Sequence, residues 1–215
     1  MTKDDLMMNE PKQDRSRATQ AKLLDTTIRI ISTRGLAATT VSLVAEEAGV
    51  SRGATQHHFP TREVLIREAV QQVAEERTQL LRDSFDELAD KEPSDREILA
   101  RVFDYFTDDL FHAAVHIWTG ATSDEDLRTT ILAAEAKSSR EIYKATAQAL
   151  RADMSDAHTR EIIRGIMDNA RGAGLSTMLV DRSERLETAL DTLADLISNP
   201  VTGIKRLPAS QPASV

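Results

Sequence analysis

The sequence predicts an all-α protein of about nine helices, arranged as two helical domains. Apolar residues recur at intervals of three and four along nearly every segment, and no segment alternates apolar and polar residues convincingly enough to indicate a β-strand. Capping residues mark several of the expected helix starts, among them Thr40, Ser51 and Ser94. We therefore expect a helical chain between two polar tails.

Both ends of the chain have the composition of disordered tails. Residues 1–14 are polar and charged, and residues 200–215 contain three prolines among small and polar side chains. Between these tails we expect a first domain over residues 15–62 and a second domain over residues 63–199.

The composition limits the chemistry that is open to the chain. A length of 215 residues with 40% hydrophobic side chains suffices for one or two domains with cores. The sequence contains no cysteine, which excludes disulfides, thiolate metal sites and a cysteine nucleophile. It shows neither an apolar leader nor an uncharged apolar stretch of about 18 residues. We expect a cytoplasmic protein with no membrane contact and no cofactor.

The first helix is expected from about Ser16 to Thr33, with Gly35 ending it. Its periodicity places three apolar residues on one face, which we expect to be buried: Leu24, Ile28 and Ile31. This helix is expected to support the two that follow.

Residues 40–62 are expected to form two short helices joined by a tight turn. Thr40 caps the first helix, Gly49 supplies the turn and Ser51 caps the second helix. The apolar face of the first helix contains Val41, Val44, Ala45 and Ala48. The second helix carries polar or small residues in place of an apolar stripe: Arg52, Gly53, Gln56, His57 and His58. Its outer surface therefore suits a polar partner such as DNA better than a core.

This segment resembles the DNA-binding domain of the TetR family of transcription regulators, in register over roughly residues 15–70. Four runs carry the resemblance: Thr39-Thr40-Val41, Val44-Ala45-Glu46-Glu47-Ala48-Gly49-Val50-Ser51-Arg52-Gly53, His57-His58-Phe59 and Thr61-Arg62-Glu63-Val64-Leu65. The resemblance implies a helix-turn-helix whose second helix enters the major groove of DNA. The residues expected to contact DNA are Thr40, Ser42, Ser51, Arg52, Gly53, Ala54, Gln56, His57, His58, Thr61 and Arg62.

One position departs from the family pattern. The family usually has a Leu-Tyr pair where this chain has Thr55-Gln56, so the phosphate contact of that tyrosine does not carry over. We expect Arg52 and Gln56 to contact bases, because glutamine pairs bidentately with an adenine edge. The phosphate contacts are then assigned to Thr40, Ser42, His57, His58 and Arg62.

Charge is distributed unevenly along the chain. The net charge of −8 opposes binding to a polyanion. Residues 12–62 nevertheless carry eight Lys and Arg against four acids, a net +4, whereas residues 63–215 carry −10. This asymmetry fits a basic end that meets phosphate and an acidic body that stays away from it. Arg15 and Arg17 are interpreted either as further DNA contacts or as part of a solvated tail.

Six further helices are expected, over about 61–90, 93–111, 112–119, 122–151, 155–180 and 183–198. The apolar residues of the last two helices are interpreted either as ordinary core or as a subunit interface. These two helices look like the dimerising pair of the TetR family, so we expect a homodimer through a four-helix bundle. Such a dimer would bind a palindromic operator.

Six of the eight aromatic residues fall between residues 93 and 151. They are interpreted either as core or as the lining of an apolar cavity, and the resemblance implies that a small-molecule effector binds in this domain. The residues expected at the effector site are Phe103, Phe106, Phe111, His112, His116, Trp118, Tyr143, Met167 and Arg171.

His112 and His116 lie four positions apart, so they share a helix face, as a pair of metal ligands would. No third ligand is evident in the sequence. Hydrogen bonding in a pocket or simple packing explains the pair better, and we expect no metal site.

Together these features favour a ligand-controlled repressor that an effector of unknown identity releases from DNA. An enzyme is the first alternative, but the sequence contains no phosphate-binding loop or nucleophile motif, so we expect no catalytic residues. A helical adaptor for another protein is the second alternative. It would account for the acidic body but not for the basic N-terminal segment.

Overall fold

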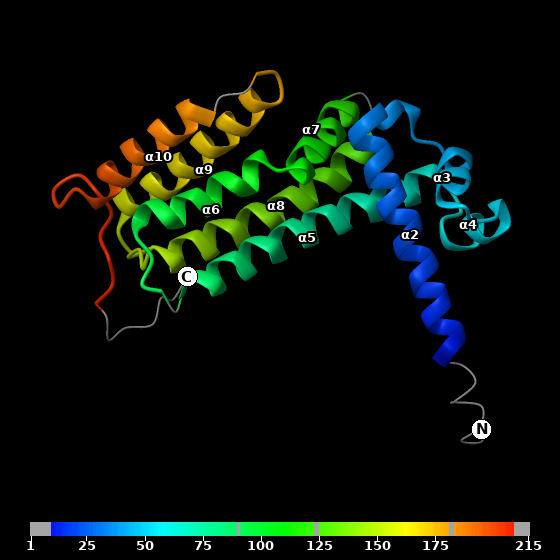
Figure 1. The fold of residues 1–215 in the computed structure, drawn as a ribbon, viewed down its shortest axis with the longest axis horizontal. Helices are drawn as coiled ribbons and strands as arrows, with labels where there is room; N and C mark the ends of the chain where they lie inside the picture. The colour runs from blue at the N-terminus through cyan, green and yellow to red at the C-terminus, as the bar shows by residue number, and fades with distance from the viewer. Residues whose placement is uncertain (1–9, 90, 123–124, 181–182, 209–215) are drawn as a thin grey trace. The chain divides into compact units, whose positions relative to one another are not determined.

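The computed structural model describes residues 10–89, 91–122, 125–180 and 183–208. Within these ranges the chain is all-helical, as predicted, with no β-strand. The elements are α2 (Glu10–Arg34), the short 3₁₀ helix η1 (Leu36–Ala38), α3 (Val41–Ala48), α4 (Arg52–His58), α5 (Arg62–Ala89), α6 (Asp95–Thr107), α7 (Asp109–Ala121), α8 (Glu125–Ala149), α9 (Ala157–Thr177) and α10 (Ser183–Ser198) (Figure 1).

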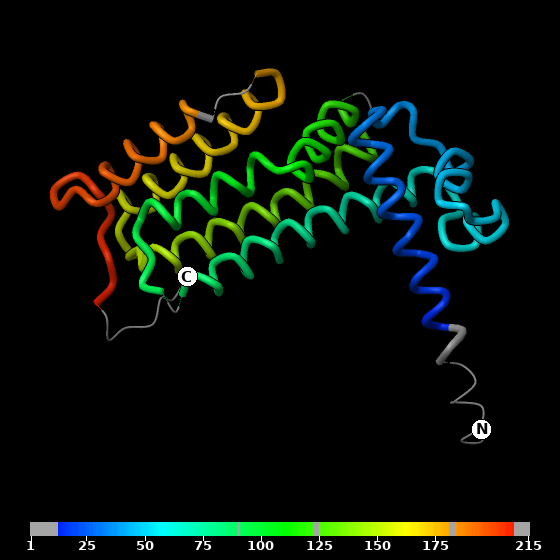
Figure 2. The backbone as a smooth tube through the Cα atoms, in the orientation of Figure 1, coloured from blue at the N-terminus to red at the C-terminus, as the bar shows by residue number. Residues whose placement is uncertain are grey.

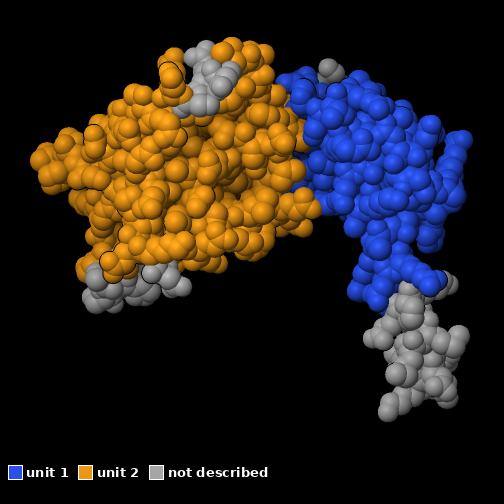
Figure 3. All heavy atoms as spheres, in the orientation of Figure 1, with its two compact units in different colours: residues 1–73, 116–132 blue, residues 74–115, 133–215 orange. Residues whose placement is uncertain are grey.

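The chain divides into two compact units, which Figure 3 shows in different colours. Unit 1 comprises residues 1–73 and 116–132, and unit 2 comprises residues 74–115 and 133–215. Helices α5, α7 and α8 therefore each contribute to both units. Unit 1 extends past residue 62, where the sequence analysis expects the first domain to end.

Unit 1 is built around α2, which packs against η1 and α3, while α3 packs against α4. The predicted inner face of α2 is confirmed, since Leu24, Ile28 and Ile31 are all buried. Helix α2 begins at Glu10, whereas the sequence analysis places a tail up to residue 14. The first turn of a helix accommodates Pro11, because the amide hydrogen that proline lacks would have no partner there. Arg15 and Arg17 thus belong to a helix, with both side chains exposed.

Unit 2 is centred on α6, which lies against both α9 and α10 (Figure 1). Ser94 begins α6 with a capping box, in which its hydroxyl accepts from the amide of Glu97 and the carboxylate of Glu97 accepts from the amide of Ser94. Asp108 separates α6 from α7 and caps the latter, accepting from the amide of Phe111 at 2.6 Å. The Asp108 cap marks the break between the two helices.

Residues 200–208 are part of the folded unit, and the prediction of a disordered tail is wrong for them. Figure 2 shows this segment leaving α10 and running back along unit 2. Ile204 is buried, the amide of Asp153 donates to the carbonyl of Lys205 at 2.8 Å, and the amide of Leu207 donates to the carbonyl of Arg151 at 2.8 Å. The burial of Ile204 and these main-chain hydrogen bonds order the segment. The proline-rich composition of the segment gives no sign of either interaction. Residues 209–215 lie outside the described residues.

No helix among the described residues combines the length and apolar character needed to cross a membrane.

Candidate functional site

The turn between α3 and α4 has the geometry of a helix-turn-helix. The hydroxyl of Thr40 accepts from the amide of Leu43 at 3.2 Å, and the hydroxyl of Ser51 accepts from the amide of Ala54 at 3.3 Å. Between the two helices Gly49 adopts the left-handed conformation, with φ 60° and ψ 34°. The two predicted caps and the predicted turn are therefore confirmed, and local hydrogen bonds mark the start of each helix and the turn between them.

Helix α4 has one buried and one exposed face. Thr55 is fully buried and donates its hydroxyl hydrogen to the carbonyl of Ser51. Phe59, which follows the helix, is also buried. The exposed residues of α4 are Arg52, Gly53, Gln56 and His57. The pair Thr55-Gln56 thus divides cleanly, with threonine in the core and glutamine on the outer surface.

The other residues predicted to contact DNA fall into two groups. Those that are exposed around α4 are Thr40, Ser42, Ser51 and Thr61. Ala54 and His58 are half-buried, and the ring of His58 is tilted against that of Phe59 with 6.3 Å between centroids. The hydroxyls of Thr40 and Ser51 already serve as helix caps, but each also retains a hydrogen to donate.

Arg62, the first residue of α5, holds the chain that leads into α3. Its Nε donates to the carbonyl of Thr39 at 2.7 Å and its Nη2 to the carbonyl of Leu36 at 2.7 Å. The sequence analysis expects Arg62 to contact phosphate, but these two hydrogen bonds direct the guanidinium to the protein's own backbone. The geometry favours a positioning role for this side chain.

Two arginines counted in the basic N-terminal segment form an internal cluster with Glu47 on α3. Arg29 and Arg34 of α2 each lie 2.7 Å from the carboxylate of Glu47. The hydrogen bond from Arg29, aided by the charges of both arginines, lowers the pKa of Glu47. This cluster fastens α3 to α2, so part of the positive charge seen in the sequence is already neutralised within unit 1.

In unit 2 a groove of about 510 Å³ runs between α8 and α9. Its lining consists of Ser139, Arg140, Tyr143, Lys144, Arg164, Met167, Asp168 and Arg171. Three residues predicted at the effector site, Tyr143, Met167 and Arg171, come together here although 28 positions separate the first from the last. We call this feature the α8–α9 groove.

The sequence analysis missed the other cations of the groove. Arg140 and Lys144 lie four positions apart on α8, and Arg164 lies seven positions before Arg171 on α9. These spacings place each pair on one helix face, which is the signal that was available. Charged residues on a helix ordinarily face water, however, so the pattern alone did not indicate a site.

The predicted aromatic lining is largely core instead. Phe103, Phe106 and Phe111 are almost completely buried, and none of them lines the groove. Phe106 and Phe111 meet edge to face with 5.5 Å between ring centroids. His116 and Trp118 belong to unit 1. The prediction grouped these residues by composition, which does not distinguish an aromatic core from an aromatic cavity.

Arg77 of α5 is a buried cation beside the break between α6 and α7. Its side chain is 3% exposed, donates to the carbonyl of Tyr105 at 2.9 Å and lies 4.0 Å above the ring of Tyr105. Asp108 is 3.9 Å away. Burial raises the pKa of Tyr105 to about 12. Nε2 of His112 is also buried and has no hydrogen-bond partner among the described residues. This cluster supports the helix break.

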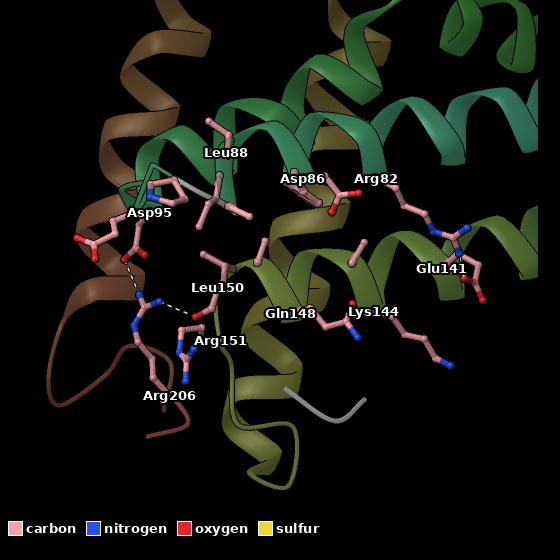
Figure 4. Close-up of a pocket in the computed structure, with 17 residues that line it drawn as sticks. Arg82, Asp86, Leu88, Asp95, Glu141, Lys144, Gln148, Leu150, Arg151 and Arg206 are labelled. Atoms are coloured by element: carbon pink, nitrogen blue, oxygen red, sulfur yellow. Dashed lines mark hydrogen bonds and ion pairs between the residues drawn. The ribbon is translucent and has the colours of Figure 1, made fainter. Parts of the chain in front are cut away.

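A second and larger cavity, of about 930 Å³, lies at another part of unit 2 (Figure 4). Its charged side chains largely pair with one another. Arg82 pairs with Glu141, and Arg206 pairs with Asp95 at 2.5 Å. Arg206 also donates to the carbonyl of Leu150 at 2.6 Å. With cations and carboxylates balanced around it, this cavity selects no particular ligand charge.

Apolar side chains are exposed near the end of α9 and on α10. They are Leu175, Leu179, Val180 and Leu196, and Leu179 is 88% exposed. A group of large exposed apolar residues commonly marks a protein interface.

A family model for the bacterial regulatory proteins of the tetR family matches residues 23–69, which include α3 and α4. Over 118 residues the chain is 30% identical to the HTH-type transcriptional regulator CymR of Pseudomonas putida. The aligned region covers 55% of this chain and 58% of CymR. The chain therefore spans less than two-thirds of that relative's length. It is 24% identical over 194 residues to the HTH-type transcriptional regulator BetI of Cronobacter sakazakii, covering 90% of this chain and 96% of BetI.

The fold also matches solved structures. A putative transcriptional regulator from Saccharomonospora viridis, solved in complex with choline, superposes with a TM-score of 0.63 at 20% identity, covering 88% of this chain and all of that one. At this identity the match shows a shared fold. Together with these similarities, the family model identifies residues 23–69, which hold the helix-turn-helix, as a domain of the tetR family of bacterial regulatory proteins.

Proposed function

We propose that the protein is a ligand-responsive transcriptional repressor, which binds a palindromic operator as a homodimer and is released by a small-molecule effector. Helix α4 is the DNA-recognition helix in this proposal. Arg52 and Gln56 contact base edges in the major groove, and the hydroxyls and imidazoles around them contact phosphates. The relatives are transcriptional regulators, and we propose no catalytic role.

The observation that carries the proposal is the division of α4 into two faces. Thr55 and Phe59 hold the helix on a buried platform, while Arg52, Gln56 and His57 project outward without an apolar residue among them. A rigid helix that presents a cation and an amide can meet the donors and acceptors of base edges with little loss of conformational freedom. Arg62 supports the same surface indirectly, by holding the backbone that leads into α3.

The exposed apolar residues near the end of α9 and on α10 support the homodimer. A recognition helix of seven residues covers only a few base pairs, so two copies are needed for a specific site. Burial of Leu175, Leu179 and Val180 against a second copy would remove their apolar surface from water.

Effector control is supported by the α8–α9 groove, where Tyr143, Met167 and Arg171 meet. The Saccharomonospora viridis neighbour with the same fold is described in complex with choline. An effector releases DNA only if it binds the DNA-incompatible state of the dimer more tightly than the DNA-bound state.

The DNA-binding proposal is tested with a duplex selected from a randomised pool by the full-length protein. Fluorescence anisotropy then compares the wild type with Arg52→Ala and with Arg101→Ala, a control that removes a half-buried arginine of α6. We expect Arg52→Ala to weaken binding by about 1–3 kcal/mol and to relax the base preference at one position of each half-site. Arg101→Ala should bind as the wild type does.

The same titrations at several salt concentrations measure the phosphate contacts. The logarithm of the binding constant should fall steeply as salt rises. If no duplex is enriched from the pool, or if Arg52→Ala binds with wild-type affinity and base preference, the assignment of α4 as the recognition helix is wrong.

A further inference from the structure

We infer that the α8–α9 groove binds a small organic anion with an apolar body, and that this anion is the effector. The second part of this inference rests on the proposed function, whereas the first part stands on the groove itself. Four cations and one carboxylate line the groove, in a chain whose net charge is −8. The lining therefore opposes the charge of the whole protein.

The cations approach the groove from both of its walls. Arg140 and Lys144 project from α8, and Arg164 and Arg171 project from α9. Because the two walls carry like charges, they repel each other until an anion lies between them. A cationic ligand would be repelled by all four side chains.

Internal ion pairs neutralise only part of this charge. Arg171 lies 3.1 Å from Asp168, and Arg164 pairs with Glu161. Arg140 and Lys144 form no ion pair with any residue that the structure describes. The wall formed by α8 thus presents two cations that are outside any ion pair, and one of them, Lys144, also lines the larger cavity.

The floor of the groove is apolar and has room for more than an inorganic ion. Met167 is buried, and the half-buried Tyr143 donates its hydroxyl hydrogen to the carbonyl of Arg160 at 3.4 Å. With its hydroxyl directed to that carbonyl, Tyr143 offers its ring to the groove. A volume of about 510 Å³ accommodates a small organic molecule, whose apolar part would lie on Met167 and Tyr143.

Arg171 connects the groove to the core of unit 2. Its guanidinium lies 5.2 Å from the ring of Phe106, which meets Phe111 edge to face next to the break between α6 and α7. An anion that draws Arg171 away from Asp168 also changes its contact with Phe106. Occupancy of the groove would thereby act on the packing at the helix break.

The test uses two pairs of probes that share an apolar body and differ in the charge of the head: octanoate with octylammonium, and phenylacetate with phenethylammonium. Isothermal titration calorimetry on the full-length protein measures their binding. We expect the anionic member of at least one pair to bind at least tenfold more tightly than its cationic counterpart. Equal binding of both members, or binding of neither pair, overturns the inference.

Charge-reversal variants locate the binding site. Arg140→Glu and Lys144→Glu alter exposed side chains and should leave the fold intact, and each should weaken binding of the anion at least tenfold. Lys137→Glu is the control, because this exposed lysine lies on the same helix outside the groove. Anion binding that survives both groove variants would place the site elsewhere. Loss of dimerisation in these variants, without anion binding by the wild type, would identify the groove as a subunit contact instead.

Operator release separates failure of this inference from failure of the proposed function. The anion is added to the complex of wild-type protein and selected duplex, and anisotropy is recorded. Release that is absent from the Arg140→Glu variant supports both conclusions. Anion binding without release rejects the anion as effector and leaves the groove site standing. If the protein binds no DNA at all, the regulator proposal fails, while calorimetry still decides the chemistry of the groove.

Discussion

Helix α4 and the C-terminal end of α9 are both exposed, but they expose opposite kinds of side chain. Helix α4 presents Arg52, Gln56 and His57, whereas the end of α9 presents Leu175 and Leu179. Water solvates the first surface well and the second poorly. When a polar partner binds the first surface, hydrogen bonds to water are exchanged for hydrogen bonds to the partner. Covering the second surface removes apolar side chains from water, which is favourable. This difference separates the proposed DNA surface from the proposed subunit surface within one chain.

The largest effect is expected from removing the platform beneath α4. Phe59 is 1% exposed, so Phe59→Ala should lower the free energy of unfolding by about 3–5 kcal/mol. Chemical denaturation followed by circular dichroism measures this change. A loss of unfolding free energy below about 1 kcal/mol would show that α4 does not depend on Phe59 for its position. The exposed face of α4 would then give no evidence that the helix is preorganised to bind DNA.

The apolar surface at the end of α9 is tested by Leu179→Asp. A charge placed where a second copy packs should raise the dimer dissociation constant at least tenfold, about 1.4 kcal/mol, as measured by analytical ultracentrifugation. Val201→Asp provides the control, since Val201 is similarly exposed, at 87%, but lies in the segment that follows α10, whereas Leu179 lies between α9 and α10. If the two variants sediment alike, Leu179 contributes no more to dimerisation than any other exposed apolar residue.

The turn that aims α4 is tested by Gly49→Ala. Gly49 has φ 60°, and a Cβ there would meet nothing closer than Nζ of Lys22 at 4.0 Å, so the cost is conformational and should be about 1 kcal/mol of unfolding free energy. Gly53→Ala is the matched control. Gly53 lies in α4 with open space around it, and alanine favours helix, so this variant should be at least as stable as the wild type. Two equal losses would contradict this account of the turn.

The smallest effect concerns the cluster of Glu47 with Arg29 and Arg34. Because the pKa of Glu47 is lowered in the folded protein from its ordinary value of 4.5, the cluster stabilises the fold above that value. The contribution is lost as the pH falls through the lowered pKa. Glu47→Gln should therefore melt at a lower temperature than the wild type near neutral pH, and the difference should shrink as the pH falls below 4.5. A difference independent of pH would mean that the carboxylate charge is not involved.

The sequence predicted best what local chemistry determines. Thr40, Gly49 and Ser51 define the helix-turn-helix through hydrogen bonds to residues within four positions, and α10 has the predicted bounds of 183–198. The polar outer face of α4 was equally predictable from the sequence. A seven-residue helix without an apolar stripe has few structural roles other than to present its polar side chains. Such features need no knowledge of distant contacts.

Features that depend on distant residues were not predicted. The α8–α9 groove brings Arg140 and Lys144 of α8 together with Arg164 and Arg171 of α9. The sequence of either helix alone does not specify that meeting. The resemblance to the TetR family implied a phosphate contact for Arg62, but the carbonyls that its guanidinium binds lie 23 and 26 positions earlier. In the C-terminal segment, the buried Ile204 and main-chain hydrogen bonds to Arg151 and Asp153 order the chain, and the overall composition of the segment indicates neither.

Close contact between α6 and α9 has a consequence for how freely this protein can vary. A Cβ at Gly174 would lie 1.7 Å from the carbonyl oxygen of Phe106, inside the space that this oxygen occupies. Gly165 and Gly172 on the same helix have open space where a Cβ would lie, but position 174 can accept a side chain only if the two backbones separate. Saturation mutagenesis of α9 should therefore tolerate no side chain larger than glycine at this position, and any homologue with a larger residue there must hold its α9 farther from the helix break.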